Sequence, residues 1–152
     1  MLGKIKKFSQ LSAYERNLFM EAYYTLGIMR VAILRVPFKK LTRSLEHKAK
    51  KGTLTELNEA QKNIAVSIGK AIEQASVHTP WESACLAQSL TAQKMLKKRG
   101  IPGVFYLGVA KDEESEEKMK AHAWSQCGDT IITGGKGHEA FTVLSVFGWK
   151  KR

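Results

Sequence analysis

Apolar residues recur at helical spacing through the first part of the chain. Ser12, with Glu15 three residues later, forms the sequence pattern of a capping box, and residues 10–50 are expected to be helical. The apolar face comprises Leu18, Phe19, Ala22, Leu26, Met29, Ile33 and Val36. Val36-Pro37 should stop or kink this helix, because the residue before a proline avoids helical backbone angles. A shorter basic helix is expected from Lys39 to Lys51.

A further helix is predicted after Gly52, which breaks the pattern. Thr53 to Glu56 is a second capping-box pattern, and the helix should end near Val77-His78, before Pro80. Its apolar positions are Leu57, Ile64, Ile68, Ala71, Ile72 and Ala75.

The next predicted helix carries a cysteine, Cys85, at its start. Thr79 or Ser83 can serve as its N-cap. Ser83 is favoured, which would put Cys85 at the second helical position. The basic run 97–99 suits the negative end of the helix dipole, and Gly100 followed by Pro102 is a stop signal.

The pattern changes to strands beyond Gly103. Strands are predicted at 104–110, 120–126, 130–133 and 141–147, with a charged loop at 111–118, a turn at Gly128-Asp129 and a flexible loop at 134–137. Helices followed by an antiparallel sheet indicate an α+β fold, with the cysteine-bearing helix packed on the sheet. A basic helical region at 1–78 and a core at 79–152 are the expected units.

Charge is concentrated at the amino-terminal end of this 152-residue chain, whose formal net charge is +11. Residues 1–51 hold 12 lysines and arginines but only 3 acidic residues. This excess fits a solvated helical face, an acidic protein or peptide partner, a membrane surface or nucleic acid. No RNA-binding signature is present, so nucleic acid is not expected as a partner.

The segment from Leu18 to Phe38 is apolar, but Glu21, Arg30 and Arg35 interrupt it, so a membrane span is not expected. Contact with a membrane surface or a partner protein stays open, while packing over the second half of the chain is favoured. No signal peptide is recognised, so a cytoplasmic location with reduced thiols is expected.

One of the two cysteines, Cys85, and one of the four histidines, His122, are candidates for catalysis. A thiol at a helix N-terminus lies in positive partial charge, which favours the thiolate. His122 lies in a predicted strand and could accept the thiol proton. Each residue alone fits an ordinary structural role, but the combination indicates a nucleophile and its base. Trp81 and Trp124 flank the pair and are expected to wall a peptide-binding cleft.

The remaining motifs indicate no cofactor. Cys127 follows a strand into a turn and is interpreted as structural. The histidines and cysteines lack the spacing of metal ligands, so no metal is expected. The glycine-rich segment 134–137 lacks the phosphate-loop pattern and reads as a mobile loop.

Over residues 79–148 the chain resembles a family, the transglutaminase-like lasso-peptide maturation proteins in their stand-alone protease form. The resemblance rests on Trp81, Cys85-Leu86, the segment 99–102, Leu107-Gly108-Val109, the segment 121–124 and the segment from Gly128 to Gly135. It implies a papain- or transglutaminase-like core with a Cys-His-Asp triad. Cys85 would be the nucleophile and His122 the general base and acid.

The third member of the triad is open in the sequence. The family acid is expected about a dozen residues after His122, where Thr133-Gly134-Gly135 stands instead. Asp129 is the nearest acidic residue, and the Thr133 hydroxyl, a backbone carbonyl or Glu139 are the alternatives. The backbone N–H of Cys85, Gln88 or a group near Trp81 could bind the oxyanion.

The resemblance also implies a function: removal of the leader peptide from a ribosomally made lasso-peptide precursor. Its implied partners are the precursor, a small leader-recognition protein in trans and the lasso cyclase. Two alternatives stay open. The same acyl-enzyme could be captured by an amine, as in a transferase, or the chain could be a non-catalytic module for an acidic partner.

Overall fold

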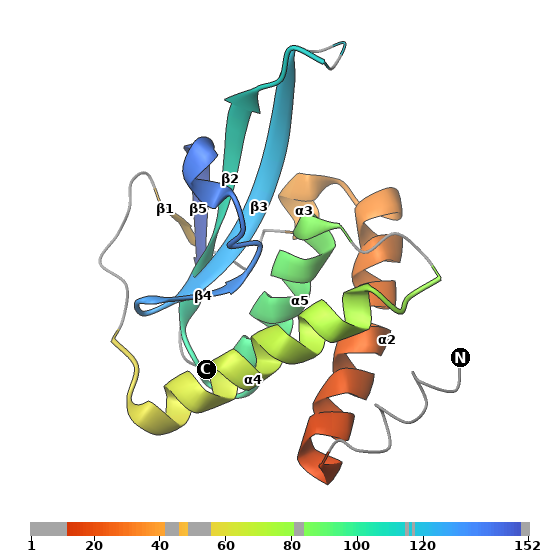
Figure 1. Ribbon diagram of the computed structural model, residues 1–152, viewed down its shortest axis with the longest axis vertical. Helices are drawn as coiled ribbons and strands as arrows, with labels where there is room; N and C mark the ends of the chain where they lie inside the picture. Colours follow the sequence, from red (N-terminus) through yellow and green to blue (C-terminus); the bar gives the residue numbers. More distant parts are fainter. Residues whose placement is uncertain are drawn as a thin grey trace.

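A computed structural model describes residues 12–41, 46–48, 56–80, 84–114, 116 and 118–149. The helices gather on one side of a single antiparallel sheet (Figure 1). The elements in chain order are α2 (Ala13–Arg35), α3 (Phe38–Leu41), β1 (Glu46–Lys48), α4 (Glu59–Ser76), α5 (Cys85–Lys98), β2 (Gly103–Lys111), β3 (Met119–Cys127), β4 (Thr130–Thr133), a 3₁₀ turn (His138–Ala140) and β5 (Thr142–Trp149). The predicted α+β class is confirmed.

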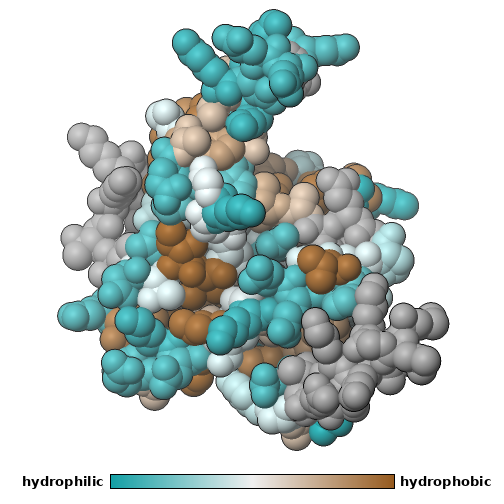
Figure 2. Space-filling view, viewed as in Figure 1, coloured by the Kyte–Doolittle hydropathy of each residue, from teal (hydrophilic) through white to brown (hydrophobic). Residues whose placement is uncertain are grey.

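The sheet has the strand order β1-β5-β2-β3-β4, and every pairing is antiparallel. Helices α4 and α5 pack on one face of it, through β4 and β3 respectively. Helix α2 packs on α4 and α5 from the outside and lies farthest from the sheet (Figure 1). The tip of the β2–β3 hairpin projects from the body and is hydrophilic (Figure 2).

Local signals fix the ends of α2. Ser12 Oγ accepts the Glu15 N–H at 3.1 Å and Glu15 Oε1 accepts the Ser12 N–H at 3.3 Å, so the predicted capping box forms. The helix ends at Arg35, and Val36, its extended C-cap, stands before Pro37, so the predicted stop is confirmed. The basic helix expected over 39–51 is wrong in its described part. Helix α3 stops at Leu41, and residues 46–48 form a strand because β5 offers hydrogen-bond partners from 100 residues away.

The caps of α4 and α5 differ from the prediction. Asn58 and Gln61 form the capping box of α4, in place of the pattern at Thr53, which lies outside the described residues. Ala84 is the N-cap of α5, so Cys85 stands at the first helical position, one earlier than expected. Gly100, at φ +72°, ends α5 as predicted, with its N–H bonded to the Lys97 carbonyl.

Two apolar clusters lie on opposite faces of the sheet. The larger joins the helices to one face, and residues on both sides of the expected 78/79 boundary share it. Its buried members include Leu18, Ala22, Leu26, Ile68, Ile72, Leu90, Leu96, Phe105 and Cys127. The smaller, on the other face, consists of Val104, Tyr106, Trp124 and Val146, with Phe141 and Val143 packed against it. Among the described helices, none has the length and apolarity needed to cross a membrane.

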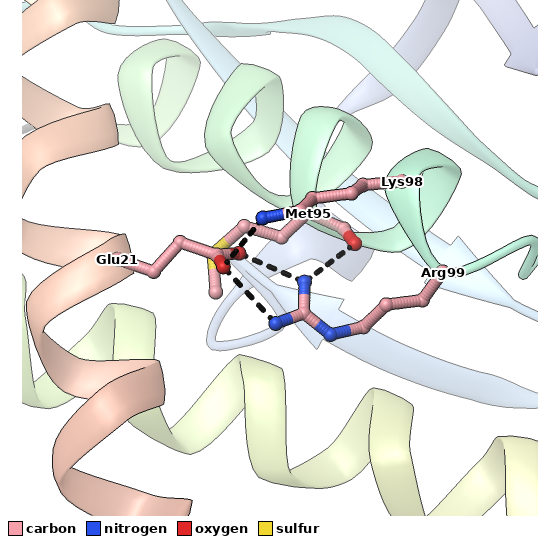
Figure 3. A network of polar contacts seen from close by, with 4 residues as sticks. All are labelled: Glu21, Met95, Lys98 and Arg99. Atoms are coloured by element: carbon pink, nitrogen blue, oxygen red, sulfur yellow. Dashed lines mark hydrogen bonds and ion pairs between the residues drawn. The ribbon is translucent and has the colours of Figure 1, made fainter.

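One ion-pair network ties α2 to the end of α5 (Figure 3). Arg99 donates to both carboxylate oxygens of Glu21, at 2.8 and 3.1 Å, and Lys98 donates at 3.2 Å. Hydrogen bonds from Arg99 hold the pKa of Glu21 below its usual 4.5, against the opposing effect of burial. Because two donors of one guanidinium bind one carboxylate, this pair is stronger than an ordinary surface contact.

Glu21→Gln is expected to lower the free energy of unfolding by about 1–2 kcal/mol at neutral pH. The pKa of Glu21 is lower in the folded protein than in the unfolded chain, so the ion pair stabilises the fold fully at pH values above the unfolded pKa. This stabilisation is lost as the pH falls through the folded pKa. The difference from wild type in urea denaturation should therefore vanish in acid. Lys98→Gln is the matched control and should cost less, because the Lys98 side chain is 66% exposed. An equal loss of unfolding free energy in Glu21→Gln at neutral and at acidic pH would contradict a stabilising ion pair at Glu21.

Candidate active site

Cys85 opens α5 and its thiol meets the backbone of β3. The Ala123 N–H donates to Cys85 Sγ, with nitrogen and sulfur 3.4 Å apart, and the cysteine is half-buried. The backbone of β3 at Ala123 is not paired with β4, because the pairing of β3 with β4 begins at Ser125. As the first residue of a helix, Cys85 lies in the positive end of the helix dipole. The thiol therefore has a backbone donor and lies beside the N–H groups at the start of the helix.

His122 immediately precedes Ala123 on β3, and its ring is held on three sides. Nε2 lies 2.6 Å from the carbonyl oxygen of Gly134. The ring stacks on Trp124 at 5.7 Å and lies 5.0 Å from the ring of Phe141. A carbonyl oxygen only accepts, so Nε2 carries the hydrogen. In the neutral ring the lone pair is then on Nδ1, which is the nitrogen able to take a proton.

The thiol and the imidazole thus lie at neighbouring residues of β3, Ala123 and His122. Successive side chains of a strand point to opposite faces, and the His122 ring lies with Trp124 on the face away from the helices. Cys85 approaches through the backbone of the next residue. The hydrogen bonds described for the two groups lead to Ala123 and Gly134 rather than to each other. Direct proton transfer from the thiol to the ring therefore requires the two groups to move into contact.

Asp129 does not orient the imidazole, which corrects the expectation from sequence. It lies in the β3–β4 turn with its side chain 84% exposed. Hydrogen bonding from the Thr130 hydroxyl, at 3.0 Å, and the nearby charge of Lys62, at 3.7 Å, lower its pKa. Seven residues of extended strand separate it from His122, roughly 20 Å along the ribbon.

Among the alternatives to Asp129 as partner of the His122 ring, the structure favours a backbone carbonyl. The Thr133 hydroxyl is 2.6 Å from the Ser125 hydroxyl in the buried interior, and Glu139 is exposed beside His138. The Gly134 carbonyl is the acceptor that contacts the ring. A backbone carbonyl is one of the acceptors that the sequence allows, but no side chain in the sequence marks which carbonyl it is.

Gly134 is required by this close approach. Its φ is +69°, and a Cβ there would collide with the Ala123 carbonyl oxygen and lie 3.0 Å from Trp124 Cβ. Gly137 has a similar φ of +77° but open space around the same position. A second imidazole contacts the loop, since His138 Nδ1 lies 2.6 Å from the Gly135 carbonyl oxygen. The loop expected to be flexible thus makes two short hydrogen bonds to histidines.

The expected cleft walls are not found at Trp124. Its side chain is 3% exposed and stacks on Tyr106 at 5.4 Å, so it supports the His122 ring from below rather than touching solvent. Trp81 lies outside the described residues. Gln88 is half-buried one turn after Cys85 on α5, and its contact with an oxyanion stays a prediction. The period of the strand could have revealed the Trp124 role, because His122 and Trp124 are two residues apart.

Cys127 is a structural thiol. It is fully buried in the larger apolar cluster, and burial raises its pKa to about 12. Both cysteines are free thiols. In the part of the chain that the structure describes, no group of three or more His, Cys, Asp or Glu side chains could hold a metal ion.

Iodoacetamide at neutral pH is expected to label Cys85 and leave Cys127 unlabelled in the folded protein. A thiol whose pKa is about 12 is almost entirely protonated at that pH, and its burial also blocks the reagent. Peptide mass spectrometry after a timed quench measures each site, and urea-unfolded protein is the control in which both should react. Equal labelling of the two sites in folded protein would contradict the assignment.

Comparison with known proteins identifies a family for most of the chain. A model described as the transglutaminase-like superfamily matches residues 32–146, which include Cys85, His122 and Gly134. Searches of curated proteins and of solved structures found no match.

Proposed function

Because this chain belongs to the transglutaminase-like superfamily, we propose that it is a cysteine endopeptidase that removes the leader from a lasso-peptide precursor. Members of the superfamily carry out cysteine protease or transferase chemistry. The observation that carries the proposal is the placement of Cys85, at the start of α5, against the backbone N–H that follows His122. The leader as substrate rests on the sequence resemblance over residues 79–148.

The proposed reaction begins with a thiolate. Nδ1 of His122 takes the thiol proton, and the sulfur of Cys85 attacks the carbonyl carbon of the last leader residue. The negative charge that develops on the carbonyl oxygen is met by backbone N–H groups at the start of α5, which lack partners within the helix. His122 then returns its proton to the departing core amine, leaving the leader as a thioester on Cys85. Water hydrolyses this thioester and restores the thiol.

Gly134 serves this reaction as an orienting acceptor. Its carbonyl holds the hydrogen on Nε2 and so keeps Nδ1 available, a role that a neutral group can fill in a cysteine enzyme. Gln88, one turn along α5, is proposed to add a side-chain donor for the oxyanion. The freed core amine is what a lasso cyclase needs, and a small leader-recognition protein in trans would present the precursor.

Reconstitution of the reaction tests the proposal. Purified protein, precursor and leader-recognition protein are mixed, and the products are weighed by mass spectrometry. Hydrolysis gives a leader with a free carboxylate and a core with a free amine. Amine capture, the transferase alternative, gives a leader heavier by the added amine less water when a primary amine is supplied. An intact precursor under all conditions would reject both.

A further inference from the structure

The outer face of α2 is an apolar stripe open to solvent. Its five side chains are exposed by 38% to 64%: Met20, Tyr24, Ile28, Val31 and Leu34. They recur every three or four residues, so they lie on one side of the helix, over about 21 Å of its length. The opposite side buries Leu18, Ala22 and Leu26 in the core. A helix that is apolar on its buried side and also on its solvent-exposed side is expected to bind a further partner through the exposed side.

Positive charge borders this stripe. From residue 22 to residue 41 the sequence contains no acidic residue, but it contains Arg30, Arg35, Lys39 and Lys40. Arg35, Lys39 and Lys40 are exposed at the end of the stripe. Glu21, the nearest acidic residue, is neutralised by Arg99 and Lys98. An occupant of the stripe must therefore combine an apolar interior with negative charge at its edge.

We propose that the outer face of α2 rests on an anionic lipid surface, with the helix lying in the plane of the interface. The aliphatic side chains enter the boundary between headgroups and acyl chains, and the cations beyond Leu34 bind the headgroups. Tyr24 suits the boundary itself, because its ring is apolar and its hydroxyl is polar. The acyl chains, the anionic headgroups and the boundary between them thus match the aliphatic side chains, the cations and Tyr24 in turn.

Two other occupants fit less well. An acidic helix docks into a groove between elements, whereas the stripe lies on the convex outside of one helix, the outermost layer of the fold (Figure 1). A second copy of this chain would bring the same cations together, and five side chains fall well short of the 20–30 residues that a stable interface uses per partner.

Contact through α2 does not reach the His122 ring. That ring lies with Trp124 on the sheet face away from the helices, and α2 lies on the far side of α4 and α5 from the sheet (Figure 1).

Vesicle sedimentation tests the proposal with the full-length protein. Vesicles of phosphatidylcholine alone are compared with vesicles that also contain phosphatidylglycerol. We expect binding to the anionic vesicles, and at least about tenfold weaker binding for the Ile28→Asp/Leu34→Asp variant. Val77→Asp is the matched control, since Val77 is 72% exposed at the end of α4, and it should bind within about twofold of wild type. Circular dichroism confirms that both variants are folded.

Several outcomes would overturn the proposal. These are no binding to anionic vesicles, equal binding by the stripe variant, or equal loss in the Val77→Asp control. Dimers in light scattering that Ile28→Asp/Leu34→Asp dissolves would assign the stripe to a second copy, and saturable binding of an acidic peptide in place of vesicles would assign it to a protein. Because no step requires precursor cleavage, Cys85→Ala protein should bind vesicles as wild type does.

Discussion

Replacing Cys85 with alanine is expected to lower kcat/KM for leader removal by at least about 10⁴-fold, because the proposed acyl-enzyme forms on the thiol of Cys85. His122→Ala should cause a loss of similar size, since both proton transfers pass through its ring. The double variant should be no slower than the worse single variant, because the two residues act as one unit. Mass spectrometric time courses of precursor cleavage measure all three.

Folding controls make this result interpretable. Cys85 and His122 are half-buried, so their removal should leave the cooperative unfolding transition close to that of wild type. Asp129→Asn is the activity control and is expected to cleave at a near wild-type rate, because Asp129 is paired with Thr130 and Lys62 in an exposed turn. Full leader removal by Cys85→Ala would end the protease proposal, whereas loss of activity in Asp129→Asn would return that residue to the site.

Gly134→Ala is expected to lower kcat by about 100-fold or more while changing KM little. The new Cβ would collide with the Ala123 carbonyl oxygen, so the segment must shift and carry its own carbonyl away from His122 Nε2. The ring then loses its fixed tautomer, as happens when an orienting group is replaced in other hydrolases. The measured quantities are kcat, KM and the dependence of kcat on pH.

Gly137→Ala is the matched control for this effect. The φ angles of Gly134 and Gly137 are +69° and +77°, so both substitutions carry a similar backbone strain of about 1 kcal/mol. At Gly137 a Cβ meets nothing within 4 Å, so activity should stay within about threefold of wild type. Nitrogen-15 NMR of the imidazole should report Nε2–H in wild type and Gly137→Ala, and a tautomer mixture in Gly134→Ala. Equal losses in the two variants would make strain, and not orientation, the cause.

Local signals made most of the fold predictable. The Ser12 capping box, the break at Val36-Pro37 and the Gly100 stop depend on neighbours in sequence, and each forms as expected. The strands from residue 103 onward were placed to within about two residues by their apolar composition and turns. The sequence also places Cys85 at a helix start and His122 in a strand, and both positions agree with the structure, while their catalytic roles stay a prediction.

The errors came from contacts between distant segments. Residues 46–48 form a strand only because β5 is present to pair with them, and nothing in their local sequence indicates it. The sequence predicts Trp124 as a cleft wall, but the structure buries it against Tyr106 and Phe141, which lie elsewhere in the chain and whose contacts no local pattern shows. The acceptor for His122 escaped prediction because a main-chain carbonyl is the same at every residue, and only folding selects Gly134.

The carbonyl at Gly134 also changes which substitutions the site can tolerate. A triad that relies on a carboxylate is lost when that one side chain is exchanged, whereas an oxygen of the main chain survives exchange of every neighbouring side chain. The constraint on sequence then falls on position 134 itself, which must be glycine because a side chain there would collide with the Ala123 carbonyl oxygen. It follows that acid cannot switch off this acceptor: an amide oxygen gains no proton in the range where aspartates titrate.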